Sequence, residues 1–331
     1  MKVVLGFSGG VDSAVSAALL RRAGWEVVGL YLDNTDENAR RDAVDTAAFL
    51  SIPLEIRDVR AELERAVCAP FCASYLRGET PNPCILCNPA VKFRALLETA
   101  DRLGAEAIAT GHYARAEGGA LYKGRRANDQ SYMLCRLRRE QLSRLVLPLG
   151  GMEKAETRAL AERLSLPVAH KKDSMEICFI PDKDYVGWLS RRGELPPPGD
   201  FIFHDEVVGR HEGIVRYTVG QRKAGLIDGR KVYISRIDAG TNAIELALWE
   251  ELFKTELTAR DFNWLIDAPA GPIRAGVRVR HTKWEEPRCT ATPAADGSVR
   301  IVCDEPVRAP APGQSAVLYD GDKVLGGGFI V

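Results

Sequence analysis

The sequence predicts an α/β fold, with a parallel-sheet domain first, a small central domain next and a C-terminal β-barrel last. In the first half, short apolar runs alternate with stretches of helix-forming composition, a rhythm typical of a parallel sheet with helices on both faces. After the run PPPGDF at 196–201 the pattern changes to short strands and turns, which is typical of small barrels or sandwiches. A chain of 331 residues is also too long for one ordinary core. Length alone favours two or three domains, and we expect three, at 1–195, 196–248 and 249–331.

The expected elements of the first half follow one another in βαβα order. Strands are expected at 1–7, 26–32, 53–59 and 107–114, and helices at 14–23, 37–50, 60–75 and 91–103. The proline-rich segment 78–90 is expected to be a loop. In the second half, strands are expected at 214–222, 231–238, 243–248, 277–284, 288–294, 298–304 and 315–321. Parallel sheets bind ligands beyond the carboxyl ends of their strands, so the segments that follow the first-half strands should meet at one crevice.

Charge and hydropathy narrow the classes of function. Lys plus Arg and Asp plus Glu both number 45, and a net charge of zero counts mildly against a nucleic-acid binder. Basic clusters are still present at 123–126, 136–139, 171–172 and 278–283. No run of 18 apolar residues occurs and the chain starts directly with a strand, so we expect no transmembrane helix, no signal peptide and a cytoplasmic protein. In that compartment the eight cysteines should be mostly reduced thiols.

The segment SGGVDS at 8–13 joins the first expected strand to the first expected helix. Gly9 and Gly10 let the backbone turn tightly and bring its N–H groups close to a ligand, and a helix start attracts anions. A plain turn with Ser13 as the helix N-cap would explain one glycine and one serine, but not the whole cluster. The cluster lacks the Gly-Lys-Ser/Thr of a Walker A loop and the GxGxxG of a dinucleotide site. It resembles the SGGxDS loop of the ATP pyrophosphatase (PP-loop) families, which split ATP between its α and β phosphates and adenylate an oxygen atom.

Two of the eight cysteines, Cys84 and Cys87, lie in the stretch TPNPCILCN at 80–88. Two prolines stiffen this stretch, and packing explains two thiols there poorly. A CxxC pair is typical of a zinc half-site or a redox pair, but no second CxxC and no HxxxH follows. Taken segment by segment, packing is the better explanation for the other cysteines, which are Cys68, Cys72, Cys135, Cys178, Cys289 and Cys303.

Motifs spread over nearly the whole chain resemble those of the bacterial tRNA-specific 2-thiouridylase family. They are GFSGGVDS (6–13), TPNPCILCN (80–88), IATGHYAR (108–115), DQSYML (129–134), KKDSMEICFI (171–180), YTVGQRKAGL (217–226) and PGQSAVLYDGDKVLGGGFI (312–330), with a basic strand near Arg278. The resemblance implies a PP-loop domain of the adenine nucleotide alpha hydrolase type. It also implies thiolation of C2 of the wobble uridine, position 34, in tRNAs for Lys, Glu and Gln.

The resemblance implies a two-stage chemistry. ATP, with Mg²⁺ offsetting phosphate charge, would adenylate the C2 oxygen, and AMP would then be the leaving group for a sulfur nucleophile. Cys87 would be the nucleophile and Cys178 the persulfide carrier, supplied by a cysteine desulfurase directly or through a sulfur-relay protein. A Cys87–Cys178 disulfide would form after transfer and require reduction. The partner would be the anticodon arm of tRNA, with the target base flipped out of its stack, and the protein would act as a monomer without a membrane partner.

By position, the resemblance assigns further residues to three roles. The residues implied to bind ATP are Gly6, Phe7, Ser8, Gly9, Gly10, Val11, Asp12, Ser13, Leu32 and Gly111. Those implied to face the target base are Asn82, Pro83 and Cys84. Those implied to contact tRNA are His112, Asn128, Asp129, Gln130, Arg278, Val279 and Gln314.

Two positions depart from the family's pattern. Asn128 stands where the family often has Lys, which removes one possible phosphate contact. Cys84 stands where many members carry Asp, a candidate acid/base beside the catalytic thiols. Together Cys84, Cys87 and Cys178 could instead hold a [4Fe–4S] cluster by three thiolates, leaving one iron open to bind sulfide. The other interpretation keeps Cys84 as a spare thiol and the persulfide route, and the sequence leaves both open.

Three rival functions are weighed against this one. Another PP-loop ligase or amidotransferase could activate a small-molecule oxygen, but it should survive the loss of Cys87 and Cys178. A non-catalytic tRNA binder would need neither thiol. A zinc-stabilised module is the weakest rival, because no complete zinc motif is present.

Overall fold

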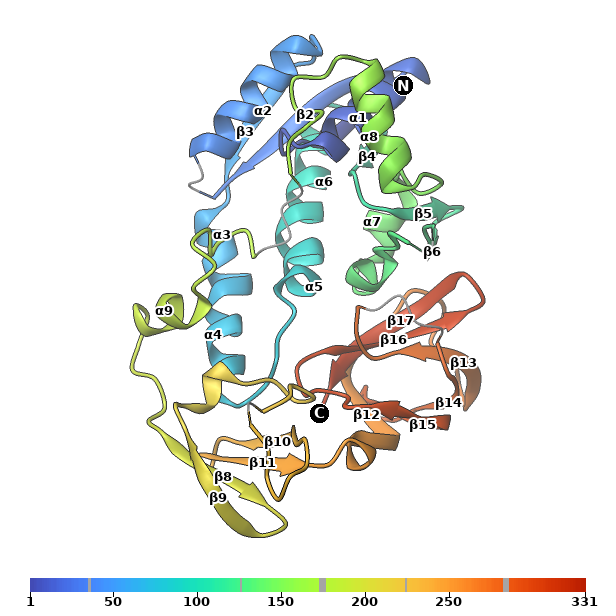
Figure 1. Cartoon of the computed structure of the whole chain (residues 1–331). Helices are drawn as coiled ribbons and strands as arrows, with labels where there is room; N and C mark the ends of the chain where they lie inside the picture. The colour runs from blue at the N-terminus through green and yellow to red at the C-terminus, as the bar shows by residue number, and fades with distance from the viewer. Residues whose placement is uncertain (35–36, 126, 173–176, 224, 282–285) are drawn as a thin grey trace. The chain divides into compact units, whose positions relative to one another are not determined.

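The computed structural model spans residues 1–331 and describes all of them except 35–36, 126, 173–176, 224 and 282–285 (Figure 1). The chain divides into two compact units, and both are assembled from separate parts of the sequence. The first unit comprises Met1–Val67, Cys84–Met175 and Gly321–Leu325, and the second comprises Cys68–Pro83, Glu176–Asp320 and Gly326–Val331. The three predicted domains divide the chain by sequence, which this division in space does not test.

A five-stranded parallel sheet in the order β3-β2-β1-β4-β7 forms the centre of the first unit. Its strands are β1 (Lys2–Gly6), β2 (Glu26–Asp33), β3 (Leu54–Asp58), β4 (Ala107–Ala109) and β7 (Leu145–Val146). Strand β1 lies between β2 and β4, and its residues Val3, Val4 and Leu5 are fully buried. A continuous apolar run is what a strand covered on both faces requires. The predicted parallel-sheet fold is therefore confirmed.

Helices contact this sheet at the predicted places, and two further helices that the sequence pattern does not predict pack against them. They are α1 (Val11–Arg22), α2 (Glu37–Phe49), α6 (Phe93–Arg102), α7 (Arg139–Ser143) and α8 (Lys154–Arg163). Helix α6 contacts β1 and β4, and the spacing of its buried residues Phe93, Leu96 and Ala100 places them on one face. Helix α1 contacts β1 and β2, and α8 packs beside α1 (Figure 1). The helices predicted at 14–23, 37–50 and 91–103 are confirmed to within a few residues.

The predicted loop at 78–90 is wrong in its second half. Residues Pro83–Cys87 form helix α5, and a π-helical turn at Asn88–Lys92 continues into α6. Proline is compatible with the first turn of a helix, where the missing N–H has no helical acceptor to lose. Ile85 is fully buried and the side-chain amide of Asn88 donates to the Met133 carbonyl, so tertiary contacts stabilise the helix. Upstream, the helix predicted at 60–75 is confirmed as α3 (Arg60–Leu63), a π-helical turn (Glu64–Cys68) and α4 (Ala69–Leu76).

The strand predicted at 107–114 is interrupted after Ala109. Residues Thr110 to Tyr113 leave the sheet before the hairpin of β5 (Ala114–Glu117) and β6 (Ala120–Lys123) begins. Lys323, which the contacts place in the first unit, pairs with Tyr122 of β6. The interruption leaves a short irregular segment at the carboxyl end of β4.

The second unit contains a four-stranded sheet in the order β10-β11-β8-β9. Its strands are β8 (Gly199–Phe203), β9 (Glu206–His211), β10 (Tyr233–Asp238) and β11 (Ala243–Ala247), which confirms the strands predicted at 231–238 and 243–248. The strand predicted at 214–222 is wrong, because Ile214–Arg216 forms a 3₁₀ turn. Gly213 and Gly220 have φ of +110° and +84°, which a regular strand does not accommodate. The apolar residues of this stretch are nevertheless buried, which explains the misleading pattern.

Six antiparallel strands form a closed barrel in the second unit, which confirms the predicted C-terminal β-barrel. The strand order is β12-β15-β14-β13-β16-β17, and pairing between β12 and β17 closes the barrel. The strands are β12 (Phe253–Trp264), β13 (Ile273–Arg278), β14 (Arg288–Pro293), β15 (Val299–Arg308), β16 (Ser315–Asp320) and β17 (Lys323–Ile330). Along β15, Val299, Ile301 and Cys303 are buried and the residues between them are exposed, the alternation expected of a barrel wall. The end of the strand predicted at 277–284 lies outside the described residues.

The second unit also holds α4 and α9 (Tyr185–Ser190). Within the described ranges, no helix of either unit is both long enough and apolar enough to cross a membrane.

Candidate active site

The loop between β1 and α1 passes close to helix α2. Gly9 has φ of +68°, and a Cβ atom built on it would lie 2.4 Å from the backbone nitrogen of Ala43. Only glycine fits such a conformation and such an approach. Gly10 is the N-cap residue of α1, and no side chain caps this helix start. The first-turn N–H groups of α1 therefore form a binding site suited to an anion.

The hydroxyls of the loop do not cap the helix. Ser13 lies inside α1, and its hydroxyl donates to the Gly10 carbonyl at 3.0 Å, so the simpler interpretation of Ser13 as the N-cap is wrong. The Ser8 hydroxyl lies 3.4 Å from that of Ser13 and 3.4 Å from the Gly10 nitrogen. These two contacts are long and weak, which suits a hydroxyl that exchanges its contacts for a ligand's oxygens.

Strand ends converge on the loop as the sequence predicts. Gly111 follows β4, and a Cβ atom on it would lie 3.1 Å from the Cβ of Asp12 in α1. A Cβ atom built on Gly6, at the end of β1, would lie 3.5 Å from the Thr110 side chain. Leu32 lies at the carboxyl end of β2, the other neighbour of β1. These segments therefore line the carboxyl edge of the sheet around one loop.

Sequence reasoning missed Lys154, the first residue of α8. Its ammonium lies 2.7 Å from both carboxylate oxygens of Asp12, and the Tyr113 hydroxyl donates to the same carboxylate at 2.7 Å. The ammonium also lies 5.6 Å from the centre of the Tyr113 ring. Positions 12 and 154 are 142 residues apart, so no local pattern links them. One sequence signal could have identified Lys154. A lysine at the start of a helix is unfavourable beside the positive end of the helix dipole, so its presence there indicates a role other than helix stabilisation.

Among the predicted tRNA contacts, His112 directly precedes Tyr113. His112 stacks on Phe93 with ring centres 6.1 Å apart, and its Nδ1 lies 2.8 Å from the Thr110 hydroxyl. Burial, reinforced by the positive charge of Lys92, holds the pKa of His112 well below its usual range. The imidazole is therefore neutral near pH 7 and acts as a hydrogen-bonding group, not a cation.

Asp129 and Gln130 stabilise the local fold through hydrogen bonds. The buried carboxylate of Asp129 accepts from the backbone of Gly124 and from the backbone and hydroxyl of Ser131. The Gln130 side chain accepts from the Tyr113 backbone N–H. The Asn128 side chain accepts from the Lys154 backbone N–H at 3.2 Å, so it anchors the start of α8.

Cys84 and Cys87 are three residues apart on α5, which places both thiols on one side of this short helix. Cys84 is exposed and Cys87 is partly exposed, while Ile85 between them is fully buried. Asn82 and Pro83, which precede the helix, are partly exposed. The helix thus presents two thiols on a fixed base.

Cys178 belongs to the second unit and is exposed on a turn. The Ile180 N–H donates to the Ile177 carbonyl at 2.9 Å, which closes the turn around Cys178 and Phe179. The Phe179 ring lies 5.5 Å from Phe71 of α4 and 5.2 Å from Trp188 of α9. Aromatic contacts of this kind fix the turn that carries the thiol. The packing interpretation of Cys178 is therefore wrong, since Phe179 and Ile180 are partly and fully buried while Cys178 itself is exposed.

The predicted tRNA contacts of the second unit are engaged inside the unit. Arg278 is 8% exposed, pairs with Glu286 and lies 4.9 Å from the centre of the Tyr319 ring. The Gln314 amide donates to the Thr80 carbonyl at 2.8 Å. Val279, next to Arg278, is partly exposed.

Several of the remaining thiols are buried. Burial raises the pKa of Cys135 and of Cys289 to about 12, and that of Cys303 to about 11, so these thiols are unreactive. Within the described ranges, no three or more His, Cys, Asp or Glu side chains gather as a metal-binding group.

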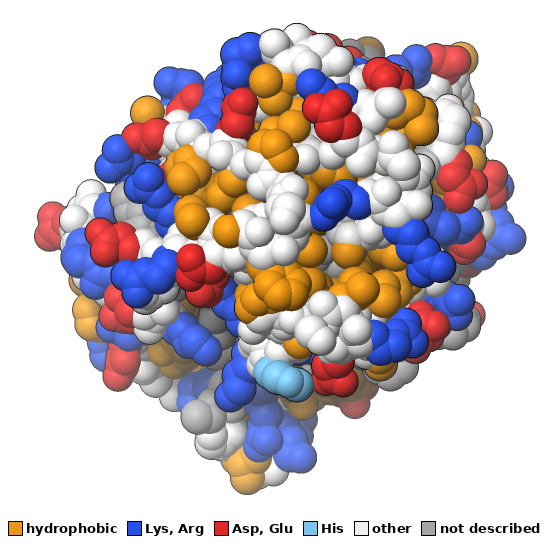
Figure 2. All heavy atoms as spheres, turned by 90° about the horizontal axis from the view of Figure 1, so that it is seen from above, with side chains coloured by type: hydrophobic (Ala, Val, Ile, Leu, Met, Phe, Trp, Pro, Cys, Tyr) orange, Lys and Arg blue, Asp and Glu red, His pale blue; other side chains and the backbone are white. Residues whose placement is uncertain are grey.

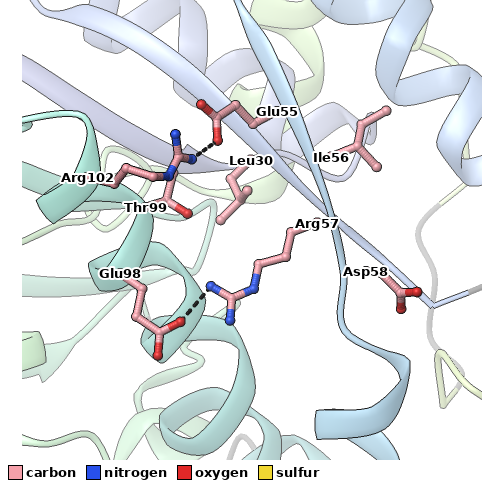
Figure 3. Close-up of a pocket in the computed structure, with 8 residues that line it drawn as sticks. All are labelled: Leu30, Glu55, Ile56, Arg57, Asp58, Glu98, Thr99 and Arg102. Carbon is pink, nitrogen blue, oxygen red and sulfur yellow. Dashed lines mark hydrogen bonds and ion pairs between the residues drawn. The ribbon is translucent and has the colours of Figure 1, made fainter.

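A hollow of about 510 Å³ lies elsewhere in the first unit, between β3 and α6 (Figure 3). Arg57 pairs with Glu98 at 2.6 Å and Arg102 pairs with Glu55, so the charges of its wall are matched to one another. None of the predicted site residues lines it. On the face that Figure 2 presents, Lys and Arg side chains are likewise interspersed with Asp and Glu, in keeping with the net charge of zero.

A parallel sheet whose first strand leads through SGGVDS into an uncapped helix defines the class of this protein: it contains a PP-loop domain that uses ATP. Family models agree with the fold. They match residues 1–182 as a "tRNA methyl transferase HUP domain", 189–247 as a "tRNA methyl transferase PRC-barrel domain" and 254–330 as an "Aminomethyltransferase beta-barrel domain".

Full-length relatives identify the family. A "tRNA-specific 2-thiouridylase MnmA" of Syntrophotalea carbinolica is 44% identical over 99% of this chain and 98% of its own, and one of Moorella thermoacetica is 42% identical over 99% and 98%. Among solved structures, a 4-thiouridine synthetase–RNA complex with bound ATP covers 58% of this chain and 50% of its own, at 20% identity and a TM-score of 0.36, too low to argue from. On the strength of the full-length relatives and the family models, the chain belongs to the tRNA-specific 2-thiouridylase family, whose members are sulfurtransferases.

Proposed function

We propose that the protein uses ATP to replace the C2 oxygen of the wobble uridine, position 34, by sulfur in tRNAs for Lys, Glu and Gln. One observation carries the proposal: the same unit holds an uncapped PP-loop helix and a helix that presents Cys84 and Cys87. An oxygen-activating loop explains the use of ATP, and thiols explain the transfer of sulfur. Neither a small-molecule ligase nor a simple RNA binder needs both.

In the first stage the C2 oxygen attacks the α phosphorus of ATP and pyrophosphate leaves. The first-turn N–H groups of α1, with Ser8 and Ser13, would bind the phosphates. Mg²⁺, when bound, offsets phosphate charge. Because the loop carboxylate of Asp12 is already paired, we expect Mg²⁺ to be held mainly by the phosphates.

In the second stage the terminal sulfur of a Cys178 persulfide attacks C2, and AMP leaves with the former C2 oxygen. The Cys87 thiolate then attacks the Cys178 sulfur and breaks the S–S bond. The uridine keeps the outer sulfur as C2=S, and a Cys87–Cys178 disulfide remains. A thiol reductant returns two electrons and two protons to regenerate both thiols. A cysteine desulfurase or a relay protein would reload Cys178, and a reducing compartment such as the cytoplasm suits this cycle.

A [4Fe–4S] cluster on Cys84, Cys87 and Cys178 is the alternative sulfur route, and it would need all three thiolates together. Each route draws on thiols of both units, and the persulfide route needs only two of them, Cys87 and Cys178. We therefore route no step through a cluster and assign Cys84 no ligand role.

For the RNA, we propose that Asn82, Pro83 and Cys84 face the target base and that the tRNA lies along His112 and the loop that follows. Neutral His112 can exchange hydrogen bonds with a base edge. The polar atoms of Asp129, Gln130 and Arg278 already have partners inside the protein, so we expect these residues to shape the surface more than to bond to RNA. Val279 and Gln314 would contribute from the barrel, and Asn128 through the start of α8. The target base must leave its stack to reach the thiols.

The test measures two products in parallel, 2-thiouridine in tRNA and pyrophosphate from ATP. We expect Cys87→Ser and Cys178→Ser each to lower thiolation by about 10³-fold or more, because no other nucleophile replaces the thiol. Pyrophosphate release in the presence of tRNA should persist. Cys72→Ser, on α4, is the matched control and should thiolate normally. Full activity of both serine variants would contradict the proposal and favour a ligase of another kind.

A further inference from the structure

We infer that Lys154 is a phosphate-binding residue, held in place by Asp12 until ATP arrives and then shared with the β and γ phosphates that leave as pyrophosphate. The inference rests on the proposed use of ATP and adds a residue that the motif does not contain. It starts from the position of one ammonium group at the PP-loop.

The ammonium of Lys154 is held from several sides. Both of its distances to the Asp12 carboxylate are 2.7 Å, and the Tyr113 hydroxyl fixes the same carboxylate from a second direction. The backbone of Lys154 is tied to Asn128, and α8 packs along α1. Lys154 and Asp12 are 18% and 32% exposed, so the pair faces a partly dry site. These contacts place a cation within the first turn of the anion-binding helix.

The charge of Asp12 makes this cation necessary. Asp12 is the second residue of α1, in the turn where the phosphates are expected. A bare carboxylate there would repel ATP, since like charges a few ångströms apart interact strongly in a site with little water. Lys154 neutralises that charge. An ammonium has three donors, and it can exchange one of its present contacts for a phosphate oxygen when ATP binds. Lysine is also a flexible point charge that can follow a phosphate group as it moves.

A simpler role for the pair would be to clamp α8 to α1. The two roles make opposite predictions for the double variant Asp12→Asn/Lys154→Met. If Lys154 only balances or holds Asp12, removing both charges together should restore what Lys154→Met loses. If Lys154 also binds phosphate, the double variant should stay as poor as Lys154→Met, whatever Asp12→Asn does alone.

The experiment measures ATP-dependent pyrophosphate release with saturating tRNA, and ATP binding by calorimetry without tRNA. For Lys154→Met we expect a loss of about 10²-fold in kcat/KM for ATP, typical of removing one charge contact to a reacting phosphate. Lys154→Gln keeps a hydrogen bond to Asp12 but not the charge, and should lose as much. Lys2→Met is the matched control: Lys2 pairs with Glu26 at 3.1 Å at the opposite end of β1 and should not matter.

The possible results distinguish phosphate binding by Lys154 from a purely structural role. Double-variant activity as low as that of Lys154→Met, with weaker calorimetric ATP binding in both, supports the inference. Activity of the double variant well above that of Lys154→Met, or normal activity of Lys154→Gln, overturns it. If the unaltered protein releases no pyrophosphate from ATP, the proposed function itself fails, which is a distinguishable result. Thermal unfolding of each variant shows whether a loss reflects folding.

Discussion

The PP-loop and the two cysteine sites differ in how their reactive groups are held. At the PP-loop, Gly9 lies tight against α2, and Asp12 has Lys154 and Tyr113 as partners. Cys84 and Cys178, in contrast, are exposed, on a five-residue helix and on a turn. The difference indicates that ATP meets a preorganised site, whereas sulfur is carried on groups that a donor, an RNA and a second thiol must all reach.

We expect the largest effect from Gly9→Ala, which disturbs the tightly packed PP-loop. The new Cβ would clash with the backbone at Ala43, where no flexible side chain can give way. We expect kcat/KM for ATP to fall by about 10²-fold, because displacing a positioning loop by an ångström has effects of that size.

Gly24→Ala is the control for that variant. Gly24 has φ of +87°, but a Cβ atom added there would meet nothing within 4 Å, so only backbone strain of about 1–2 kcal/mol in the free energy of unfolding is expected. Equal activity of the two variants would contradict a rigid ATP loop.

An intermediate effect should come from loosening the turn that carries Cys178. Phe179→Ala removes the ring that packs on Phe71 and Trp188. We expect thiolation to fall about 10-fold while pyrophosphate release is unchanged, since only the position of the thiol is disturbed. Phe262→Ala, which removes a ring 4.5 Å from Trp264 on β12, is the matched control. If both products fall together in Phe179→Ala, the cluster serves general stability and not the thiol.

The smallest effect concerns His112 and the pH dependence of stability. Its folded pKa lies well below the usual value of 6.5, so below that pH the unfolded chain binds a proton that the folded protein does not. The free energy of unfolding should therefore fall as pH drops below 6.5, by at most about 1.4 kcal/mol per pH unit from this residue.

Urea unfolding between pH 5.5 and 7.5 measures this slope, and His112→Asn should flatten it. Burial also lowers the pKa of His211, which contributes in the same direction in both proteins and cancels in the comparison. An unchanged slope in His112→Asn would contradict a neutral imidazole at this position.

Local patterns predicted the rigid region better than the cysteine sites. The strand–SGGVDS–helix sequence carries its structure within about a dozen residues, so the loop, β1 and α1 could all be predicted. The helix under Cys84 and Cys87 was predicted as a loop, because Ile85 and Asn88 stabilise it through contacts with distant residues. The stretch 214–222 failed for a related reason, since its apolar residues are buried by a turn and not by a strand.

Long-range pairs could not be predicted at all. The Asp12–Lys154 contact spans 142 residues, and the Phe71–Phe179 contact joins α4 to a distant turn. Neither pair has a spacing that periodicity detects. Both pairs contain residues that hold reactive groups in place. The sequence therefore indicates the reactive residues more readily than the residues that position them.

The central claim is that sulfur passes through Cys87 and Cys178 without an iron–sulfur cluster. The most direct measurement is 2-thiouridine formation by anaerobically purified protein, with ATP, Mg²⁺, unmodified tRNA, cysteine and a cysteine desulfurase, and with iron determined on the same sample. Cys84→Asp is assayed alongside. The account predicts that iron-free protein thiolates tRNA and that Cys84→Asp stays within about threefold of it. Activity that rises and falls with iron content, together with an inactive Cys84→Asp, would contradict it.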